Sequence, residues 1–256
     1  MAIRVSEGPK RALVTGAGAR LGKAMAEALG EDGWSVAIHY RGSKTGAEAT
    51  AATIKAAGGR AALVQADLSN EEQTATLERA AHEALGGPLT LLVNSASTFE
   101  DDTAIEHTRD NWDFHMGPNF RAPVLLAQHF ARALPQDEAG LIVNKVDMRV
   151  LKLNPLIFTY TLSKSALWTA TRTMAQSFAP NIRVNGIGPG PTLENVHQAP
   201  GEFAADAQAT LTQQGSNPGE IVKTLRYLIE ADSITGQLIA SDGGQHLMWQ
   251  TPDVML

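Results

Sequence analysis

Short apolar runs recur along the chain at regular intervals and predict the strands of a sheet. Each run is continuous rather than alternating, which is typical of a strand that is covered on both faces. Longer stretches with helical character separate the runs. The predicted strands are Ala12–Thr15, Ser35–Tyr40, Ala61–Gln65, Leu89–Asn94, Leu141–Val146, Ile182–Ile187 and Gln237–Ala240. The predicted helices are Leu21–Glu31, Thr45–Ala57, Glu71–Leu85, Arg109–Ala133, Thr159–Phe178 and Pro218–Glu230.

Strand and helix alternate throughout, and this alternation predicts an α/β fold with a doubly wound parallel sheet of seven strands and helices on both faces. No break in composition and no repeat divides the 256 residues, so we expect a single domain over 1–256, with a flexible segment at 1–9. The one long irregular stretch, 188–216, follows a strand at the edge where ligands of such folds bind. We expect it to form a substrate loop with a short helix around Glu202–Leu211.

Composition and charge narrow the range of functions. The chain has no cysteine, which excludes disulfides, thiolate nucleophiles and cysteine-ligated metals. Its net charge of −6 argues against nucleic acid or an anionic membrane as a partner. The N-terminus does not resemble a signal peptide, and no apolar run approaches the roughly 18 residues of a membrane span. The histidines show no metal-ligand spacing. We therefore expect a cytoplasmic protein without a metal that acts on a small molecule.

A glycine-rich turn, Thr15-Gly16-Ala17-Gly18-Ala19-Arg20-Leu21-Gly22, joins the first predicted strand to the first predicted helix. Gly16 and Gly18 permit a tight turn and a close approach of the backbone to pyrophosphate, and Gly22 lets helix and strand pack closely. The helix that follows offers free N–H groups and its positive dipole end to phosphates. At the start of a βαβ pattern, the turn predicts a dinucleotide site of Rossmann type. We expect the cofactor to contact Gly16, Gly18, Arg20, Leu21 and Gly22.

The end of the second predicted strand indicates which dinucleotide binds. NAD-binding folds usually carry an acidic residue there to hold the ribose hydroxyls. This strand ends His39-Tyr40-Arg41-Gly42-Ser43, without an acid. Arg41 and Ser43 suit a 2′-phosphate instead, because a guanidinium binds phosphate through two parallel hydrogen bonds. NADP(H) is therefore the expected cofactor. We expect Tyr40, Asp67 and Leu68 to line the same site, with Asp67 near the adenine ring.

Tyr160 and Lys164 lie one turn apart on the same face of a predicted helix. A free tyrosine has a pKa near 10 and is a poor acid–base catalyst at neutral pH. A fixed ammonium nearby favours the phenolate and is expected to lower the pKa of Tyr160. The pair predicts a centre in which Tyr160 donates a proton to the substrate as hydride arrives from the nicotinamide.

The order and spacing of several motifs resemble the short-chain dehydrogenase/reductase family over nearly the whole chain. These motifs are the glycine turn, Asn94-Ser95-Ala96-Ser97, Tyr160 with Lys164, Pro189-Gly190 and Asp242-Gly243-Gly244. The resemblance implies that Lys164 also holds the nicotinamide ribose and that Asn119 supports a water relay to Lys164. It implies a homotetramer, which is common in the family. It further implies that the cofactor is lined by Asn94, Ala96, Pro189 and Gly190.

Three departures from the family pattern point to a subgroup. Arg20 stands where most members have a glycine, and Asn-Ser-Ala-Ser stands in place of Asn-Asn-Ala-Gly. Asp147 stands 13 residues before Tyr160, where most members have a catalytic serine. These changes occur together in pteridine reductases and the related dihydromonapterin reductases, which the chain resembles. In that subgroup a phenylalanine two residues beyond the serine stacks on the pterin, and here it is Phe99.

The chemistry of a pterin is consistent with these residues. A pterin is a flat, polar heterocycle that fits between a nicotinamide and the ring of Phe99, with Ser97 and Arg20 at its edge. Reduction of its C=N bond needs a hydride on carbon and a proton on nitrogen, and Asp147 beside Tyr160 could relay that proton. The sequence thus predicts NADPH-dependent reduction of a dihydropterin.

Two other functions stay open. The first is an NADPH-dependent ketone or 3-oxoacyl-thioester reductase that tolerates Asp147. The second is a non-catalytic NADP-binding protein, against which the retention of Tyr160, Lys164 and Asn119 counts. Asp147 could also mark a member that lost its serine and its activity, and Phe99 could be a packing aromatic.

Overall fold

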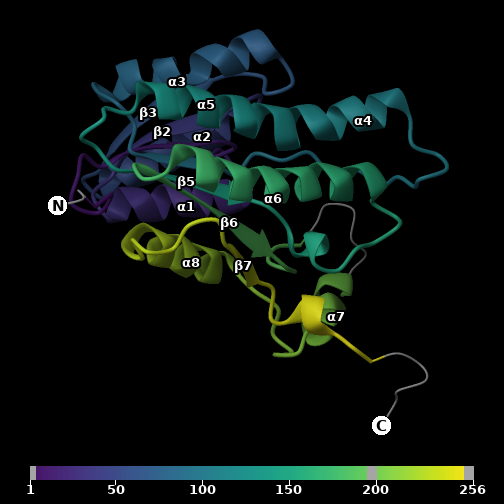
Figure 1. Cartoon of the computed structure of the whole chain (residues 1–256). Helices are drawn as coiled ribbons and strands as arrows, with labels where there is room; N and C mark the ends of the chain where they lie inside the picture. The colour runs from purple at the N-terminus through teal and green to yellow at the C-terminus, as the bar shows by residue number, and fades with distance from the viewer. Residues whose placement is uncertain (1–3, 195–200, 251–256) are drawn as a thin grey trace.

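The computed structural model describes residues 4–194 and 201–250, and within them seven parallel strands form one sheet (Figure 1). The order is β3-β2-β1-β4-β5-β6-β7. The predicted doubly wound α/β fold is confirmed, because the chain starts in the middle of the sheet and builds first one half and then the other. The strands are β1 (Arg11–Val14), β2 (Ser35–Tyr40), β3 (Arg60–Gln65), β4 (Leu91–Asn94), β5 (Gly140–Lys145), β6 (Ile182–Pro189) and β7 (Leu238–Ser241).

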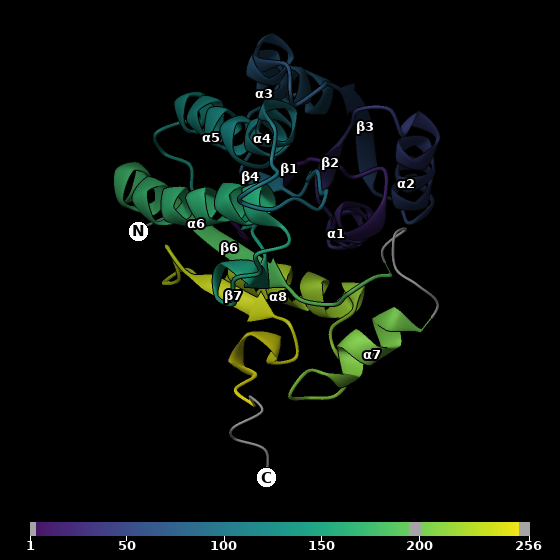
Figure 2. The same ribbon diagram turned by 90° about the vertical axis from the view of Figure 1, so that its right-hand side faces the viewer.

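Helices cover both faces of the sheet (Figure 2). One face carries α1 (Arg20–Glu31), α2 (Lys44–Ala56) and α8 (Pro218–Glu230), and the other carries α3 (Glu71–Leu85), α5 (Ala122–Ala133) and α6 (Phe158–Phe178). Each layer buries its own apolar cluster, with Met25 and Ile54 in the first and Leu77 and Leu126 in the second. Each such side chain contributes roughly 1.5–3 kcal/mol by leaving water. None of the helices in the described ranges is long and apolar enough to cross a membrane.

The predicted helix Arg109–Ala133 is divided into three parts. These are α4 (Arg109–Met116), a wide π turn η1 (Gly117–Arg121) and α5. Pro118 explains the break: it has no N–H to donate to the carbonyl of Phe114, and its ring crowds that carbonyl. A single π turn accommodates such a defect and often occurs at a functional site. The Gly117-Pro118 pair was the sequence signal for this break.

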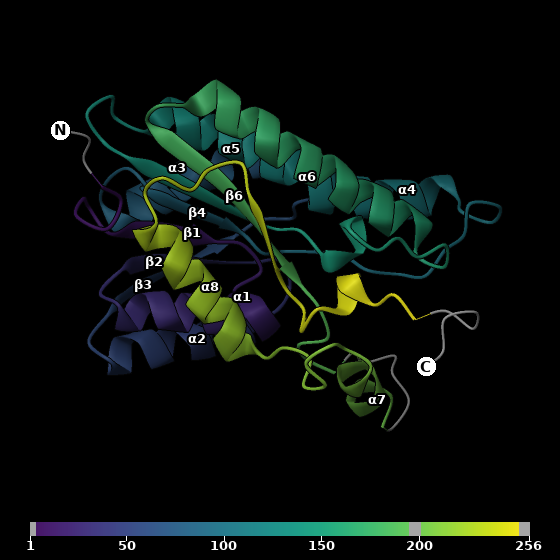
Figure 3. The same ribbon diagram turned by 60° about the horizontal axis from the view of Figure 1, so that its bottom comes forward.

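The carboxyl ends of all the strands meet at one edge of the sheet, where doubly wound folds bind their ligands. Beyond this edge lie η2 (Met148–Val150), α7 (Glu202–Gln208) and η3 (Gln245–Leu247) (Figure 3). The stretch 188–216, predicted to be irregular, begins with the last two residues of β6, which continues to Pro189. It also contains α7, the short helix expected there. Its residues 195–200 lie outside the described residues. So do residues 1–3 of the predicted flexible segment, whereas Val5 in the same segment is buried.

Candidate functional site

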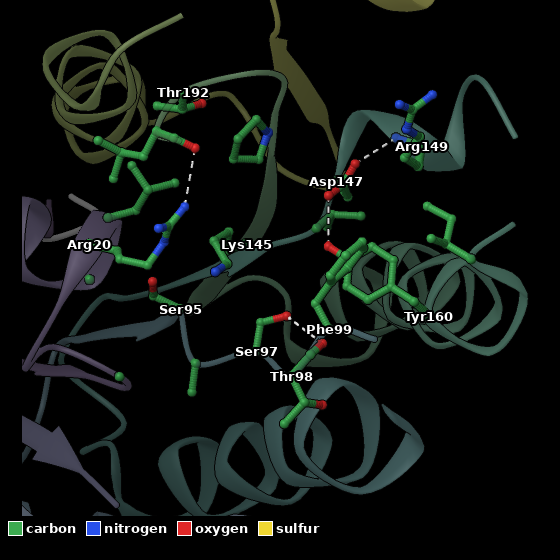
Figure 4. A pocket seen from close by; sticks show the side chains of 18 of the residues that line it. Arg20, Ser95, Ser97, Thr98, Phe99, Lys145, Asp147, Arg149, Tyr160 and Thr192 are labelled. Carbon is green, nitrogen blue, oxygen red and sulfur yellow. Dashed lines mark hydrogen bonds between the residues drawn. The ribbon is translucent and has the colours of Figure 1, made fainter. Parts of the chain in front are cut away.

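A cavity of about 870 Å³ opens at the carboxyl edge of the sheet (Figure 4). A volume of this order is typical of a small-molecule site. The wall is formed by the segments that follow β1 to β6, together with the start of α6. The predicted site residues that line it are Gly16, Arg20, Leu21, Gly22, Arg41, Asp67, Leu68, Ala96, Ser97, Phe99, Asp147, Tyr160, Pro189 and Gly190.

The glycine turn after β1 leaves no room for side chains. Gly16 has a positive φ of 66°, and a Cβ on it would lie 2.9 Å from the Cα of Ala96. A Cβ on Gly22 would lie 2.3 Å from the carbonyl oxygen of Gly16. No side chain caps the first turn of α1, whose N-cap residue is Ala19. Its N–H groups and the positive end of its dipole therefore face a cradle that fits the pyrophosphate of a dinucleotide.

His39, on β2, supports this turn from within the protein. Its Nδ1 accepts a hydrogen bond from the N–H of Gly16 at 3.1 Å, and its Nε2 lies 3.1 Å from the carbonyl oxygen of Ala66. The network thus assigns the proton to Nε2 and makes the ring neutral. Burial lowers the pKa of His39 from 6.5 to about 4. The sequence analysis gave His39 no role, although a polar residue within an apolar strand was a visible signal.

The residues predicted to hold the 2′-phosphate differ in their access to the cavity. Arg41 is exposed and lines it. Ser43 lies behind, at the N-cap of α2 and against Gly18, where a Cβ would be 2.9 Å from the Ser43 carbonyl oxygen. Tyr40 is buried in the core beneath. Arg41 is the member of this group that lines the cavity, and the predicted cofactor contacts of Tyr40, Ser43 and Gly18 stay predictions.

Arg20 has a left-handed φ of 51° and points across the cavity rather than along it (Figure 4). Its guanidinium donates hydrogen bonds to the carbonyl oxygens of Leu193, at 3.2 Å, and Glu194, at 2.9 Å. The turn after β1 is thereby linked to the segment after β6. The predicted contacts of Arg20 with cofactor and pterin stay predictions.

Tyr160 and Asp147 form the centre of the site. The Tyr160 hydroxyl donates a hydrogen bond of 2.7 Å to Oδ2 of Asp147, and Oδ1 of Asp147 accepts one of 2.8 Å from the N–H of Arg149. The ring of Phe99 lies 4.9 Å from that of Tyr160, edge to face at 80°. The sequence analysis therefore named three residues that the fold brings together from separate segments (Figure 4).

The pKa of Tyr160 is raised well above 10, so the prediction of a lowered pKa is wrong. Burial is the largest cause, and the charge and hydrogen bond of Asp147 add to it, because both disfavour a second anion. Lys164 does not offset them, since its Nζ lies 5.7 Å from the Tyr160 ring centroid and donates to the Lys145 carbonyl at 3.0 Å. Burial and the neighbouring Lys145 lower the pKa of Lys164 to about 7. Tyr160 thus holds its proton firmly, which suits a proton donor.

Asn119 lies in η1 and fixes the segment after β4. Its Oδ1 accepts from the N–H of Thr98 at 2.8 Å, and its Nδ2 donates to the Thr98 carbonyl at 3.0 Å. The carbonyl of Phe114, freed by Pro118, accepts from the Thr98 hydroxyl at 2.5 Å. The π turn therefore positions Ser97 and Phe99 on either side of Thr98. Asn119 does not line the cavity, and its implied water relay to Lys164 stays a prediction.

A chain of buried polar groups joins the sheet to α6. Asn94 donates to Asn144 at 2.8 Å, Asn144 donates to the hydroxyl of Thr171 at 2.9 Å, and that hydroxyl donates to the carbonyl of Leu167 at 2.8 Å. Asn94 is buried behind the cavity wall, as Lys164 is, and its predicted cofactor contact stays a prediction. The chain fixes α6, and with it Tyr160, relative to β4 and β5.

Lys145 lines the cavity although the sequence analysis gave it no role. It is the last residue of β5, and its backbone carbonyl accepts the hydrogen bond from Lys164. Burial lowers the pKa of Lys145 from 10.5 to about 8, with Asp147 opposing the shift and Arg20 adding to it. A lysine at the end of the apolar run Leu141–Val143 was the signal that could have found it.

Comparison with known proteins places these features among oxidoreductases. The family model described as short chain dehydrogenase matches residues 10–203. An uncharacterized oxidoreductase of Methylorubrum extorquens is 34% identical over 244 residues, which cover 92% of this chain and 97% of that protein. The 3-oxoacyl-[acyl-carrier-protein] reductase FabG of Staphylococcus epidermidis is 28% identical, with 93% and 99% covered.

Two crystal structures extend the comparison. FolM alternative dihydrofolate reductase 1 from Brucella canis, complexed with NADP, is 47% identical with a TM-score of 0.92, and the match covers 96% of this chain and 97% of that one. The angucycline C-6 ketoreductase LanV with bound NADP is 31% identical with a TM-score of 0.86, covering 93% and 96%. These matches confirm the predicted oxidoreductase class, and both crystal structures hold the predicted cofactor, NADP.

Proposed function

The chain belongs to the short-chain dehydrogenase family, and we propose that it is an NADPH-dependent reductase that acts on the C=N bond of a dihydropterin. The observation that carries the proposal is the 2.7 Å hydrogen bond from Tyr160 to Asp147 in the cavity wall. The 47% identity to a protein named as a dihydrofolate reductase supports the substrate class, because dihydrofolate contains a dihydropterin ring.

A carboxylate beside Tyr160 favours reduction of C=N over reduction of C=O. When hydride reaches the carbon of a ketone, its oxygen gains negative charge, which a neighbouring carboxylate repels. When hydride reaches the carbon of a C=N bond, the nitrogen needs a proton, and partial positive charge at that nitrogen is stabilised by a carboxylate. Asp147 therefore distinguishes the two substrate classes electrostatically, which a neutral serine would not do.

Residues on the other side of the cavity fit the cofactor. The cradle at Gly16 and Gly22, at the N-terminus of α1, would hold the pyrophosphate of NADPH. Arg41 lines the cavity without a neutralising acid on its own strand end and would face the 2′-phosphate. When bound, this cofactor supplies the hydride.

Tyr160 and Asp147 supply the proton. The raised pKa of Tyr160 keeps the phenol protonated at neutral pH, so it is ready to donate to a ring nitrogen. After the phenol has given up its proton, a proton from solvent restores it by way of the Asp147 carboxylate. Asp147 suits this relay because it lines the open cavity and contacts the phenol oxygen. The backbone N–H of Arg149 holds the carboxylate in position throughout.

Phe99 provides a surface for a flat ring. Its side chain is 39% exposed on the cavity wall, which is unusual for a phenylalanine whose role is packing alone. The hydrogen bonds of Asn119 and Thr98 hold its backbone, so the ring is presented by a fixed segment. Ser97 on the same segment offers a hydroxyl for the polar edge of the heterocycle.

The test compares substrate classes in the wild-type enzyme and in Asp147→Ser. We expect NADPH oxidation with dihydrobiopterin or dihydrofolate and none with an acetoacetyl thioester. In Asp147→Ser, kcat/KM should fall for the pterins and rise for the thioester. Asp137→Ser, an exposed position between α5 and β5, should change neither.

Two outcomes would contradict the proposal. Turnover of the thioester by the wild-type enzyme, with pterins inert, would favour the ketone or 3-oxoacyl-thioester reductase. The LanV and FabG likenesses are the observations behind that alternative. Binding of NADPH without turnover of either class would favour a non-catalytic NADP-binding protein.

A further inference from the structure

We propose that Lys145 is a cofactor-binding residue whose ammonium pairs with the pyrophosphate of the dinucleotide. The inference rests on use of a dinucleotide cofactor and not on the identity of the substrate. It adds a second side-chain cation, beside the predicted contact of Arg20, to a subsite that the backbone of the glycine turn and the α1 dipole form.

The direction of the Lys145 side chain follows from the pleat of β5. Side chains alternate along a strand, so Lys145 lies on the same face as Val143. Val143 packs in the apolar cluster on the α1 and α8 side of the sheet. Asn144 lies on the opposite face, where it bonds Thr171 of α6. Lys145 is therefore on the side where α1 begins, at the edge that the phosphate turn occupies.

The close view of the cavity agrees with this placement. Lys145 points into the cavity between Arg20 on one side and Asp147 with Tyr160 on the other (Figure 4). A dinucleotide that runs from the turn after β1 to the catalytic tyrosine must cross this position. The substrate surface of Phe99 and Ser97 lies on a different segment, after β4.

Two cations and one carboxylate surround Lys145, so positive charge is in excess there. Lys145 meets Arg20 from α1, Lys164 from α6 and the carboxylate of Asp147, which already accepts the Tyr160 hydroxyl. Among residues 4–194 and 201–250 its ammonium makes no hydrogen bond and no ion pair within 4.0 Å. Burial is the largest cause of the lowered pKa of Lys145, about 8; Arg20 adds to the shift and Asp147 opposes it. A pyrophosphate would supply the missing negative charge.

Calorimetric titration of the full chain at pH 7 tests the proposal without a substrate. We expect Lys145→Met to lower the affinities for NADPH and NADH by the same factor, roughly tenfold or more. This is the loss of affinity typical of a lost charge-assisted hydrogen bond. The affinity for adenosine 2′-monophosphate, which carries the 2′-phosphate but neither phosphate of the pyrophosphate, should not change. Lys145→Arg should restore most of the affinity. Lys55→Met, exposed at the far end of α2, is the matched control.

Proton uptake provides a second readout. At pH 8 about half of the Lys145 side chains are neutral, given the pKa of about 8, so an anion bound beside them draws in protons. NADPH titrations in two buffers of different ionisation enthalpy should reveal this uptake in the wild type and a smaller one in Lys145→Met.

Unchanged NADPH affinity in Lys145→Met would overturn the proposal. An equal loss of affinity for adenosine 2′-monophosphate would also overturn it, because the residue would then act on the structure of the site as a whole. Neither result depends on which substrate is reduced, so a failure here is distinct from a failure of the pterin assignment.

Discussion

The backbone N–H of Gly16 donates its hydrogen bond to Nδ1 of His39 at 3.1 Å, and this bond joins the phosphate-binding turn to β2. Only an unprotonated Nδ1 accepts it. Protonation of His39 would therefore remove a support of the turn and place a charge in the core. Burial opposes protonation and lowers the pKa of His39 from 6.5 to about 4.

The free energy of unfolding should consequently fall as the pH drops from about 6.5 to about 4. In this pH window His39 is protonated in the unfolded chain but not in the folded chain. The unfolded state therefore binds more protons, and lowering the pH stabilises it relative to the folded state. The difference between the two pKa values corresponds to a decrease of roughly 3 kcal/mol in the free energy of unfolding. Denaturant unfolding of the wild type and His39→Gln at pH 7 and 4.5 isolates this effect. The stability difference between the two proteins should change by most of that amount, and a constant difference would contradict the assignment.

Tyr160→Phe removes the proton donor and keeps the ring contact with Phe99. We expect kcat to fall by roughly 10²- to 10⁴-fold, the usual contribution of general acid catalysis, while NADPH affinity stays within about twofold. Steady-state turnover and a binding titration check the two parts. Tyr227→Phe, exposed on α8, is the control and should behave as the wild type. Retention of a tenth or more of the activity would mean that another group donates the proton.

Phe99→Ala separates a stacking surface from a packing residue. If Phe99 stacks on the substrate, kcat/KM for a dihydropterin should fall by roughly tenfold, in line with about 1 kcal/mol for an aromatic pair, and Phe99→Tyr should retain activity. The side chain is 39% exposed, so unfolding should be little affected. A stability loss of about 3 kcal/mol or more, as for a buried phenylalanine, would instead identify a packing role.

Arg41→Met tests the selectivity for the 2′-phosphate. Loss of a guanidinium that binds phosphate should lower the affinity for NADPH by roughly tenfold or more and leave the affinity for NADH unchanged. Titration of both dinucleotides provides the measurement. Arg79→Met, exposed on α3, should alter neither affinity. An equal loss for both cofactors would place Arg41 elsewhere than at the 2′-phosphate.

Features that depend on local pattern could be predicted from the sequence. The strand Ser35–Tyr40 and the helix Glu71–Leu85 have their predicted bounds, because continuous apolar runs and helical periodicity are properties of neighbouring residues. The glycine turn could be predicted for the same reason, since Gly16 and Gly22 meet steric limits set within one βαβ unit. Tyr160 and Asp147 could be placed in one site because the family spacing is retained.

Features that depend on the distance between remote groups could not be predicted. The raised pKa of Tyr160 follows from its burial and from a 2.7 Å contact with Asp147. Neither the burial nor this distance can be calculated from the spacing of the residues along the chain. Likewise, Lys145 gains its importance from Arg20 and Lys164, which lie on other elements. The burial of the Tyr40 and Asn94 side chains behind the cavity wall is another property that depends on the whole fold.

The polar chain from Asn94 through Asn144 to Thr171 has a consequence for how the site is assembled. Apolar surfaces tolerate small sliding movements, whereas a buried amide that loses its partner costs roughly 1–3 kcal/mol. A shift of α6 along the sheet would break the bond from Asn144 to Thr171 and leave both groups buried. The helix α6 therefore packs on the sheet in one position, which it reaches during folding. Tyr160, the proposed proton donor, is thus held in place before any ligand arrives, and binding energy is not consumed in aligning it.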